Sequence, residues 1–594
     1  FDFEYIEPYD PGFAKSVMQE WVNSFSAVYV QTVPGANLKT IEKNINEIIK
    51  KHNPTDKVST YFAFPMSKWH LQSDFKNGVN VGGMIEYVKL FSIIAIIILI
   101  IACINFMNLS TARSEKKAKE VGIRKTLGSG KKQLITQFFC ESMLFTLIAC
   151  TLSVLFVYLL LPSFNSLTGK QLGPEILQPF FWIGVFSIMI FTGFISGSYP
   201  ALYLSSFNPI AVLKGNMLSG KKALLPRRIL VTSQFVISIL LISATIIVYQ
   251  QIQHVKNRAS GYDSENLVMI PSTEDLNRNF SVVKEELLKT GAIDAVTRTS
   301  SPLTEVWWSS PGPDCIGKPA KGQIVFTGLT TDADFTKTLG IKILHGKDFS
   351  GMPADSSCML LNKTAVEVMG LKNPVGMQMR YANTIYTVKG VVDDIVMESP
   401  FKPVSPLMIY YDDKSSGFIN LRLNQAIPAH QSIKYAEAII KKYNPSYPFE
   451  YEFVNEVYNR KFISEELISK LTTIFASLAI FICCIGLAGL TAFTIEKRTR
   501  ELGVRKVLGA SLTQLAKLIS REFIQLVSIA FVITIPLTWI LMNKWLQNYS
   551  FHISINVWVF IAVGFLVLAL TLIIVFLNIL RTGNKNPIKS LRNE

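Results

Sequence analysis

Residues 496–522 of this chain read EKRTRELGVRKVLGASLTQLAKLISRE, and residues 115–141 read EKKAKEVGIRKTLGSGKKQLITQFFCE. The two stretches align at a fixed offset of 381 residues, and each lies between two long apolar runs. The identical positions that we single out are Glu120, Gly122, Arg124, Lys125 and Gly128, and Glu501, Gly503, Arg505, Lys506 and Gly509. An internal repeat of this kind predicts a chain built from two copies of one unit.

The composition is that of a membrane protein with sizeable soluble parts. Of the 594 residues, 49% are hydrophobic and 17% are charged, against roughly 25% charged in an ordinary soluble domain. The net charge of +16 comes from residues 88–253 and 467–594, while the rest of the chain is slightly acidic. Because the excess charge accompanies apolar runs, it indicates loops that orient membrane spans and argues against a nucleic-acid partner.

Seven apolar runs are each long enough to cross ~30 Å of hydrocarbon as a helix. They lie at about residues 88–110, 134–161, 179–204, 229–250, 468–494, 519–545 and 557–580. Placing every strongly basic loop on the cytoplasmic side leaves residue 1 outside the cell and residue 594 inside. The sequence therefore predicts an α-helical polytopic membrane protein.

The repeat extends beyond the two charged stretches. AVYVQTV at residues 27–33 and STYFAFP at residues 59–65 are predicted strands around a predicted helix at residues 37–54. Residues 419–454 repeat this strand, helix, strand order before the fifth span, and NPIAVLK at residues 208–214 is repeated by the segment NPIKSLR near the end of the chain. Because the first unit lacks an opening span, we expect the sequence to be truncated at its N-terminus.

Five segments follow from this organisation. They are the end of a first outer domain (1–87), a three-span domain with a cytoplasmic loop at 111–133 (88–227), a transmembrane helix that opens the second unit (228–253), a second outer domain (254–466), and a three-span domain with a cytoplasmic loop at 495–517 and a cytoplasmic tail (467–594). The second outer domain mixes strand and helix patterns, which predicts an α+β fold. Its Cys315 and Cys358 lack metal-type spacing but can form a disulfide.

The two charged stretches allow two interpretations. Glu120–Arg124 and Glu501–Arg505 are i,i+4 pairs in the favourable helical order, as are Glu115–Lys119 and Glu496–Arg500. Each stretch is either a solvated basic helix end or a docking helix for a cytoplasmic partner. We favour docking, because charge rules alone do not require the same Glu, Gly and Arg-Lys twice.

Catalytic and nucleotide-binding motifs are missing from the sequence. GSGKK at residues 128–132 lacks the first Gly and the final Ser/Thr of a phosphate loop. The six histidines lack metal-ligand spacing, and Asp393–Asp394 is interpreted as a turn that ends a strand. A membrane-anchored enzyme is therefore disfavoured, and we expect no catalytic residue and no metal.

Several spans carry polar or small residues. The polar ones are Asn105, Asn108, Glu141, Gln234 and Glu522. They can line a substrate path, but hydrogen bonds between helices or an interfacial position are favoured. Gly486 and Gly489 indicate a close contact between helices.

These features together resemble the bacterial FtsX-like or MacB-type ABC transporter permeases. The resemblance rests on ELGVRKVLGAS after a span, the twin four-span layout, and NPI-x-x-L-Lys/Arg after the last span of each half. In the second outer domain, FTKTLGIKILHGKDFS, NPVGMQM and VKGVVDDI resemble the MacB-type periplasmic core domain. The implied fold is two tandem FtsX-like repeats with α+β extracytoplasmic domains in the bacterial inner membrane.

The resemblance implies a permease subunit that works with a separate cytoplasmic ABC ATPase dimer. The ten identical positions named above would touch the ATPase. ATP and Mg²⁺ would bind to the ATPase and not to this chain. The expected function is export or extraction of a peptide, amphiphile or lipoprotein. The alternative is a mechanotransmitter that regulates a periplasmic partner such as a cell-wall hydrolase. Membrane lipids and a periplasmic adaptor are the other expected partners.

Overall fold

The computed structural model describes part of the chain, which forms two compact units, residues 1–97 and 98–594. The described residues are 21, 28–54, 60–76, 78–173, 177–205, 221–315, 324–382, 384–414 and 417–583. Both NPI segments and the predicted C-terminal tail lie outside them, as do the side chains of residues 112–120 and 122.

The first unit contains the predicted helix but not the predicted strands. Helix α2 (Leu38–His52) begins after Asn37, whose side chain accepts a hydrogen bond from the Lys39 N–H. Residues 28–33 and 60–65 form no strand, so both strand predictions are wrong over the described residues.

Side chains of α2 account for the second of these errors. The Asn46 amide donates to the Tyr61 carbonyl at 2.6 Å and accepts from the Tyr61 N–H at 2.9 Å. The Ala63 N–H donates to Glu42. These bonds give the backbone of Tyr61 and the N–H of Ala63 partners without a neighbouring strand. The unit also contains the short helix α3 (Met66–Trp69) and a hairpin of β1 (Asp74–Lys76) and β2 (Val79–Gly82).

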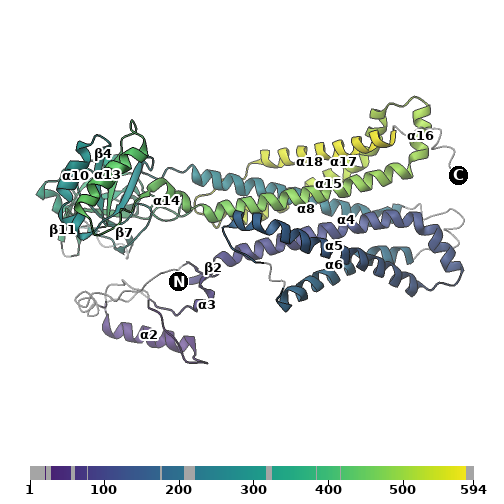
Figure 1. Cartoon of the computed structure of the whole chain (residues 1–594), viewed down its shortest axis with the longest axis horizontal. Helices are drawn as coiled ribbons and strands as arrows, with labels where there is room; N and C mark the ends of the chain where they lie inside the picture. Colours follow the sequence, from purple (N-terminus) through teal and green to yellow (C-terminus); the bar gives the residue numbers. More distant parts are fainter. Residues whose placement is uncertain are drawn as a thin grey trace. The chain divides into compact units, whose positions relative to one another are not determined.

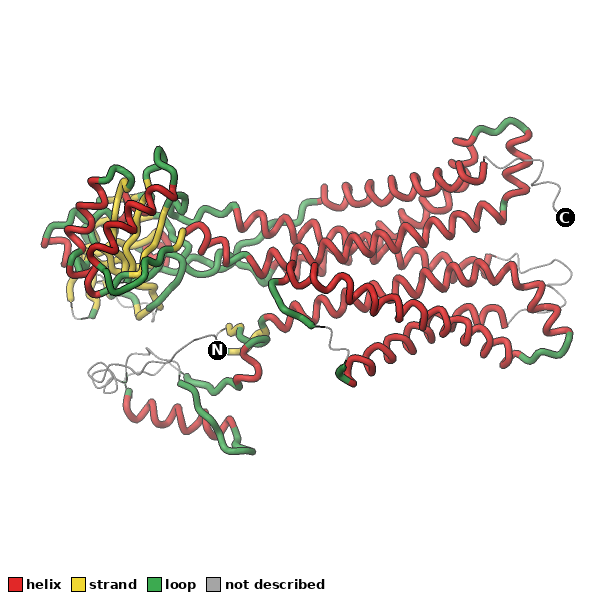
Figure 2. Tube along the Cα trace, in the orientation of Figure 1, coloured by secondary structure: helices red, strands yellow, loops and turns green. Residues whose placement is uncertain are grey.

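Among the described residues, seven helices are long and apolar enough to cross a membrane, which agrees with the seven predicted spans (Figures 1 and 2). They are α4 (Met84–Thr126), α5 (Lys131–Thr168), α6 (Pro179–Ser205), α8 (Lys221–Lys256), α15 (Ile463–Lys497), α17 (Leu512–Leu546) and α18 (Val557–Gly583). The segments predicted as loops at 111–133 and 495–517 are mostly helical, because α4 continues to Thr126 and α16 (Thr499–Val507) follows α15.

Helices α4 and α15 meet at equivalent positions of the two repeats. The Asn105 side chain donates to the Ile482 carbonyl at 3.1 Å. A Cβ placed on Gly486, which lies 381 residues after Asn105, would be 2.2 Å from Asn105 Oδ1, and one on Gly489 would be 2.3 Å from Leu109. The predicted hydrogen bond between helices and the predicted close contact are both confirmed.

Helix α8 packs against α15 and α17. The Thr245 hydroxyl lies 3.4 Å from the Thr472 carbonyl on α15, and the Thr534 hydroxyl on α17 lies 3.3 Å from the Val236 carbonyl. Gln234, which the sequence marks as a polar residue within a span, is buried. The helices of the second repeat therefore form one packed group around α8.

A mixed sheet with covering helices, which we call the sheet domain, lies between α8 and α15. Its strands are β3 (Leu267–Pro271), β4 (Ile293–Thr299), β5 (Ser309–Pro311), β6 (Asp314–Cys315), β7 (Val325–Thr331), β8 (Ile343–Gly346), β9 (Cys358–Asn362), β10 (Gln378–Tyr381), β11 (Thr384–Val392), β12 (Leu407–Tyr411), β13 (Phe418–Leu423) and β14 (Glu452–Phe453). Its helices are α9 (Glu274–Arg278), α10 (Phe280–Lys289), α11 (Phe335–Leu339), α12 (Lys363–Val368), α13 (Ala429–Tyr443), α14 (Val454–Arg460) and the 3₁₀ helix η1 (Pro353–Ser357). The α+β prediction is confirmed.

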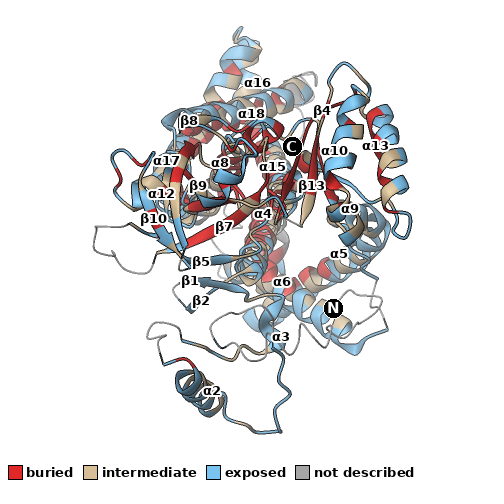
Figure 3. Ribbon diagram, turned by 90° about the vertical axis from the view of Figure 1, so that its left-hand side faces the viewer, coloured by how far each residue is buried: buried red, intermediate tan, exposed pale blue. Residues whose placement is uncertain are grey.

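The sheet has two parts joined by a single residue pair. Its order is β14-β3-β13-β4-β7-β12-β9-β11-β10-β6, with β5 on β7 and β8 on β11. Strands β4 and β7 pair only through Thr299 and Thr331. The strand residues are largely buried (Figure 3), and α10 and α13 pack on the β3-β13-β4 part. Cys315 and Cys358 are both free, so the described chain contains no disulfide between them.

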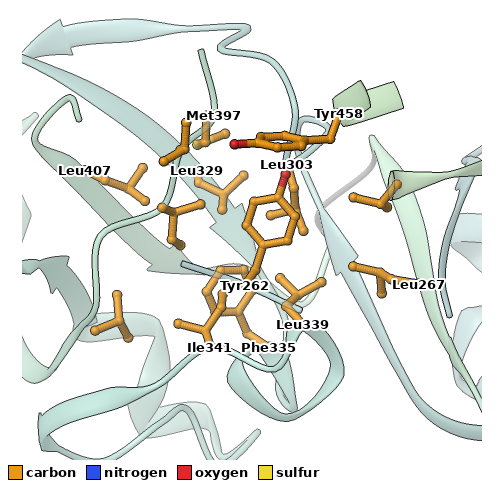
Figure 4. Packing of buried hydrophobic residues seen from close by; sticks show 14 of the residues in the cluster. Tyr262, Leu267, Leu303, Leu329, Phe335, Leu339, Ile341, Met397, Leu407 and Tyr458 are labelled. Carbon is orange, nitrogen blue, oxygen red and sulfur yellow. The ribbon is translucent and has the colours of Figure 1, made fainter. Parts of the chain in front are cut away.

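A large core cluster of the described residues lies where the sheet domain meets the membrane helices. Tyr262 and Tyr458 pack edge to face with ring centres 6.3 Å apart among Leu303, Leu329 and Phe335 (Figure 4). Tyr549 and Phe551, from the connection between α17 and α18, pack against the same cluster. Apolar packing therefore ties the sheet domain to an element outside it.

Candidate functional site

The first charged stretch forms a tight turn between α4 and α5, which we call the first basic turn (residues 120–133). Gly128 has a φ of +98°, a conformation that glycine adopts without the steric cost of a Cβ. Its N–H donates to the Lys125 carbonyl at 3.1 Å, and the Ser129 N–H donates to the Arg124 carbonyl at 3.0 Å. This pair of bonds is the Schellman arrangement that ends a helix.

The second basic turn (residues 501–514) repeats this geometry between α16 and α17. Gly509 has a φ of +90°; its N–H donates to the Lys506 carbonyl at 3.0 Å, and the Ala510 N–H donates to the Arg505 carbonyl at 2.9 Å. Gln133 and Gln514 also act alike, since each side chain accepts from the backbone N–H three residues before it. Turn structure alone therefore explains why glycine recurs at positions 128 and 509 and why glutamine recurs at positions 133 and 514.

Leucine occupies the tip of both turns without a structural reason. Leu127 is 81% exposed and Leu508 is 80% exposed. The turn bonds involve their backbones and not their side chains. The sequence shows that this leucine recurs in both copies, but only its exposure in the structure distinguishes it from a leucine that packs in a core. Leu127 and Leu508 are therefore not among the ten positions singled out above.

No contact within this chain requires glycine at position 503. It lies inside α16 with a helical backbone, and a Cβ placed on it would meet no atom within 4 Å. Glycine costs about 1 kcal/mol relative to alanine in a helix interior. A position that tolerates alanine sterically yet carries glycine is suited to close approach by another molecule.

The charged positions are accessible at both turns. Arg124, Glu501 and Arg505 are exposed, and Lys125 and Lys506 are half-buried. The predicted Glu501–Arg505 pair forms at 2.9 Å. The other three predicted pairs involve Glu115, Lys119, Glu120 or Arg500, whose side chains lie outside the described residues, as does Gly122.

Local electrostatics differ between the turns. Burial, together with the charge of Lys131, lowers the pKa of Lys125. The Arg124 guanidinium donates to the Gln137 side chain on α5 at 3.1 Å. In the second copy, helix α15 stops at Lys497, and Arg498 forms an ion pair with Glu522 on α17 at 2.5 Å. The first basic turn therefore follows directly from the membrane helix α4, while a break at Arg498 separates the second from the membrane helix α15.

Both turns lie at the same end of the membrane helices, which we call the basic end (Figure 1). The contacts of Asn105 with Ile482 and of Leu109 with Gly489 make α4 and α15 parallel. The Arg227 guanidinium at the start of α8 lies 3.4 Å from Thr494 near the end of α15. The structure thus brings the two predicted stretches to one end.

The joint between the sheet domain and the membrane helices was not predicted from the sequence. The Lys461 ammonium, just before α15, donates to the carbonyls of Thr304, Met397 and Glu398. Gln251 on α8 is fully buried, and its amide binds the Phe551 carbonyl and the Ile553 N–H, each at 2.9 Å. Long-range partners of this kind leave no local sequence signal.

Other chemistry finds no support among the described residues. No group of three or more His, Cys, Asp or Glu side chains in that part of the chain could hold a metal ion. The Asp394 carboxylate accepts from the Thr364 N–H and hydroxyl, each at 2.8 Å. Strand β11 ends at Val392, as predicted, but Asp393 and Asp394 form no turn.

Comparison with known proteins gives one family and several relatives. The FtsX-like permease C-terminal model matches residues 92–209 and 473–587. The macrolide export ATP-binding/permease protein MacB of Bdellovibrio bacteriovorus is 25% identical over 196 residues, which are 32% of this chain and 28% of that protein. MacB of Campylobacter jejuni is 30% identical over 121 residues, 20% of this chain and 18% of that protein. The chain thus matches less than a third of the length of these relatives.

Among solved structures, the periplasmic region of MacB from Actinobacillus actinomycetemcomitans covers 35% of this chain and 96% of its own, at 14% identity and a TM-score of 0.25. The extracellular domain of the transporter YknZ from Gram-positive bacteria covers 32% of this chain and 98% of its own, at 13% identity and a TM-score of 0.22. The two family matches coincide with the two sets of membrane helices that carry the basic turns. This chain therefore carries the FtsX-like permease domain twice.

Proposed function

We propose that this chain is the permease subunit of an ABC transporter and that a separate cytoplasmic ATPase dimer docks on its two basic turns. The observation that carries the proposal is the pair of exposed leucines, Leu127 and Leu508, at equivalent positions. A single exposed leucine is ordinary, but the same exposed leucine beside Arg-Lys in two copies fits two equal contacts. The ATPase surface would offer an apolar pocket with an acidic rim.

Gly503 supports the same proposal independently. A glycine whose Cβ would meet nothing within 4 Å leaves room for a partner backbone to approach α16. ATP and Mg²⁺ would bind to the ATPase dimer, and this chain would supply no catalytic group.

Movement at the basic end has a direct route to the sheet domain. Helix α15 has 35 residues, which at 1.5 Å per residue make a rod of about 50 Å. Lys461 holds three carbonyls of the sheet domain just before this helix begins. Lys256 on α8 pairs with Glu466 on α15, so the two helices would move together. ATP-driven closure of the ATPase would then displace the sheet domain.

The output that we propose is export or extraction of a peptide, amphiphile or lipoprotein at the outer face of the bacterial inner membrane. The likeness to proteins named for macrolide export supports transport. The alternative output is regulation of a periplasmic partner such as a cell-wall hydrolase, through the same docking and the same helices. A periplasmic adaptor is a further proposed partner.

The docking step is tested by reversing charge at both turns. The double variant Glu120→Lys, Glu501→Lys should lose co-purification with an ABC-type ATPase of the same cell while the chain still inserts into the membrane. Glu274→Lys, an exposed reversal on α9 of the sheet domain, is the matched control and should retain the ATPase. Retained binding by the double variant would contradict docking at these turns.

The output is tested in reconstituted vesicles that contain the chain and its ATPase. Export predicts that ATP hydrolysis removes a labelled peptide, amphiphile or lipoprotein from the outer leaflet. If hydrolysis moves none of these but changes the activity of an added cell-wall hydrolase, the regulatory alternative replaces export.

A further inference from the structure

A groove of about 600 Å³ opens between α8 and α17 near the basic end. One end of it is polar, with Arg228, Glu522 and Gln525, and the other end is apolar, with Val236, Ile237, Ile529 and Ile533 among its walls. Both helices begin at the basic end, so the polar end of the groove faces the membrane surface and the apolar end faces the bilayer interior.

The dimensions of the groove match one leaflet. Arg228 and Ile237 are nine residues apart on α8, and Glu522 and Ile533 are eleven apart on α17. At 1.5 Å per residue these spacings span about 14–16 Å, which is half of the ~30 Å hydrocarbon core.

The charges at the polar end select an anion. Glu522 is already paired with Arg498 at 2.5 Å, which offsets its negative charge. Arg228 is exposed and forms no ion pair or hydrogen bond with any residue that the structure describes. Its neighbour Arg227 behaves differently, since it bonds to Thr494 and stacks on Phe493. Among the groove residues that the structure describes, Arg228 is thus the cation available to a ligand.

We propose that this groove binds an anionic phospholipid of the leaflet at the basic end. The Arg228 guanidinium would hold the phosphate through two parallel N–H bonds, the Gln525 amide would face the glycerol and ester oxygens, and one acyl chain would lie along Ile529 and Ile533. Basic pockets between spans recognise acidic headgroups by this combination of charge and apolar burial. The site is separate from the basic turns and does not depend on the ATPase.

Native mass spectrometry of the detergent-solubilised full chain tests the proposal. The chain is titrated with dioleoyl phosphatidylglycerol or with dioleoyl phosphatidylcholine, which share acyl chains and differ in headgroup charge. The native chain should bind the anionic lipid more tightly. Arg228→Gln should weaken that binding about fivefold, the effect of one basic side chain near an anionic surface, and Arg228→Lys should recover part of it.

Two further variants separate the groove from general surface charge. Arg521→Gln removes an exposed arginine one residue before Glu522 that does not line the groove, and it should leave binding unchanged. Ile529→Trp fills the groove from a half-exposed position and should abolish the preference for the anionic lipid.

Four results would overturn the proposal. Equal binding of the two lipids, or equal losses in Arg228→Gln and Arg521→Gln, would leave no specific site. Competition by glycerol phosphate at the same concentration as the lipid would assign the site to a free phosphate. A mass of two chains that disappears in Ile529→Trp would assign the groove to self-association.

Discussion

Replacing Gly503 by alanine should have opposite effects on the stability of α16 and on its docking. The residue lies in a nine-residue helix, and the added Cβ would meet no atom within 4 Å. The substitution therefore introduces no clash within the chain. It removes the extra conformational freedom that glycine has in the unfolded helix, which is worth about 0.5–1 kcal/mol.

The stabilising effect is measurable as amide hydrogen exchange of residues 499–507 in the full chain. A gain of 0.5–1 kcal/mol slows exchange by about two- to fivefold. A partner packed against the glycine would instead meet an extra methyl group. Overpacking a close contact costs about 1–3 kcal/mol, so the dissociation constant of the ATPase should rise about 5- to 150-fold.

Gly184→Ala is the matched control, because Gly184 is also inside a helix with nothing within 4 Å of its Cβ position. It lies in α6, away from both basic turns, and should leave ATPase binding unchanged. If Gly503→Ala slows exchange but leaves the dissociation constant within twofold of the native value, no partner packs on Gly503, and the glycine has no docking role.

Three other predictions follow from named contacts. Leu508→Asp should weaken ATPase affinity at least tenfold, because one leucine is no longer buried in the complex. Thermal unfolding of the chain should be unchanged, because the side chain is 80% exposed. Equal affinity of the variant and the native chain would refute the apolar pocket. Gly486→Ala should destabilise the pairing of α4 and α15 by about 1–3 kcal/mol, because its Cβ would lie 2.2 Å from Asn105 Oδ1. Adding Asn105→Ala should recover part of the thermal midpoint of the solubilised chain, because it removes the clash together with the bond to Ile482. No recovery would show that the clash is elsewhere. Burial alone would raise the pKa of Asp355, but bonds from Lys389 and Ser350 outweigh it and lower that pKa, so its stabilisation is present above pH 3.8 and is lost as pH falls through the lower folded value. Asp355→Asn should therefore cost about 1–3 kcal/mol at pH 7 and weaken the acid dependence of proteolysis of the sheet domain; an unchanged pH profile would contradict this assignment.

Local sequence signals predicted the membrane helices and most of the sheet domain. The seven apolar runs needed only length and hydropathy, because each span satisfies its own backbone hydrogen bonds. In the strand at residues 384–392 and the helix at residues 280–290, apolar residues recur with the period of the strand or helix that forms. Strand β4 gives a weaker local signal, because Thr297, Arg298 and Thr299 are polar in sequence although all three are buried.

The predicted strands at residues 27–33 and 59–65 show the opposite error. Their β-branched and aromatic residues favour strands, but a strand also needs a partner for its backbone. Among the described residues, Asn46 and Glu42 bond to residues 60–65 instead. Whether a segment finds such a partner depends on contacts far along the chain.

Some features of the two basic turns follow from local sequence, and others depend on tertiary structure. Sequence by itself determined the repeat, which is visible from aligning the two stretches. It also determined the turns at Gly128 and Gly509 and the Glu501–Arg505 pair, because each of these depends on residues within five positions of one another. The positive charge of both stretches also predicted that they share one side of the membrane. Tertiary structure alone decided that Leu127 and Leu508 are exposed and that a groove opens between α8 and α17. Exposure and proximity depend on which surfaces other helices cover, and that is set by packing between residues hundreds of positions apart, such as Asn105 with Gly486.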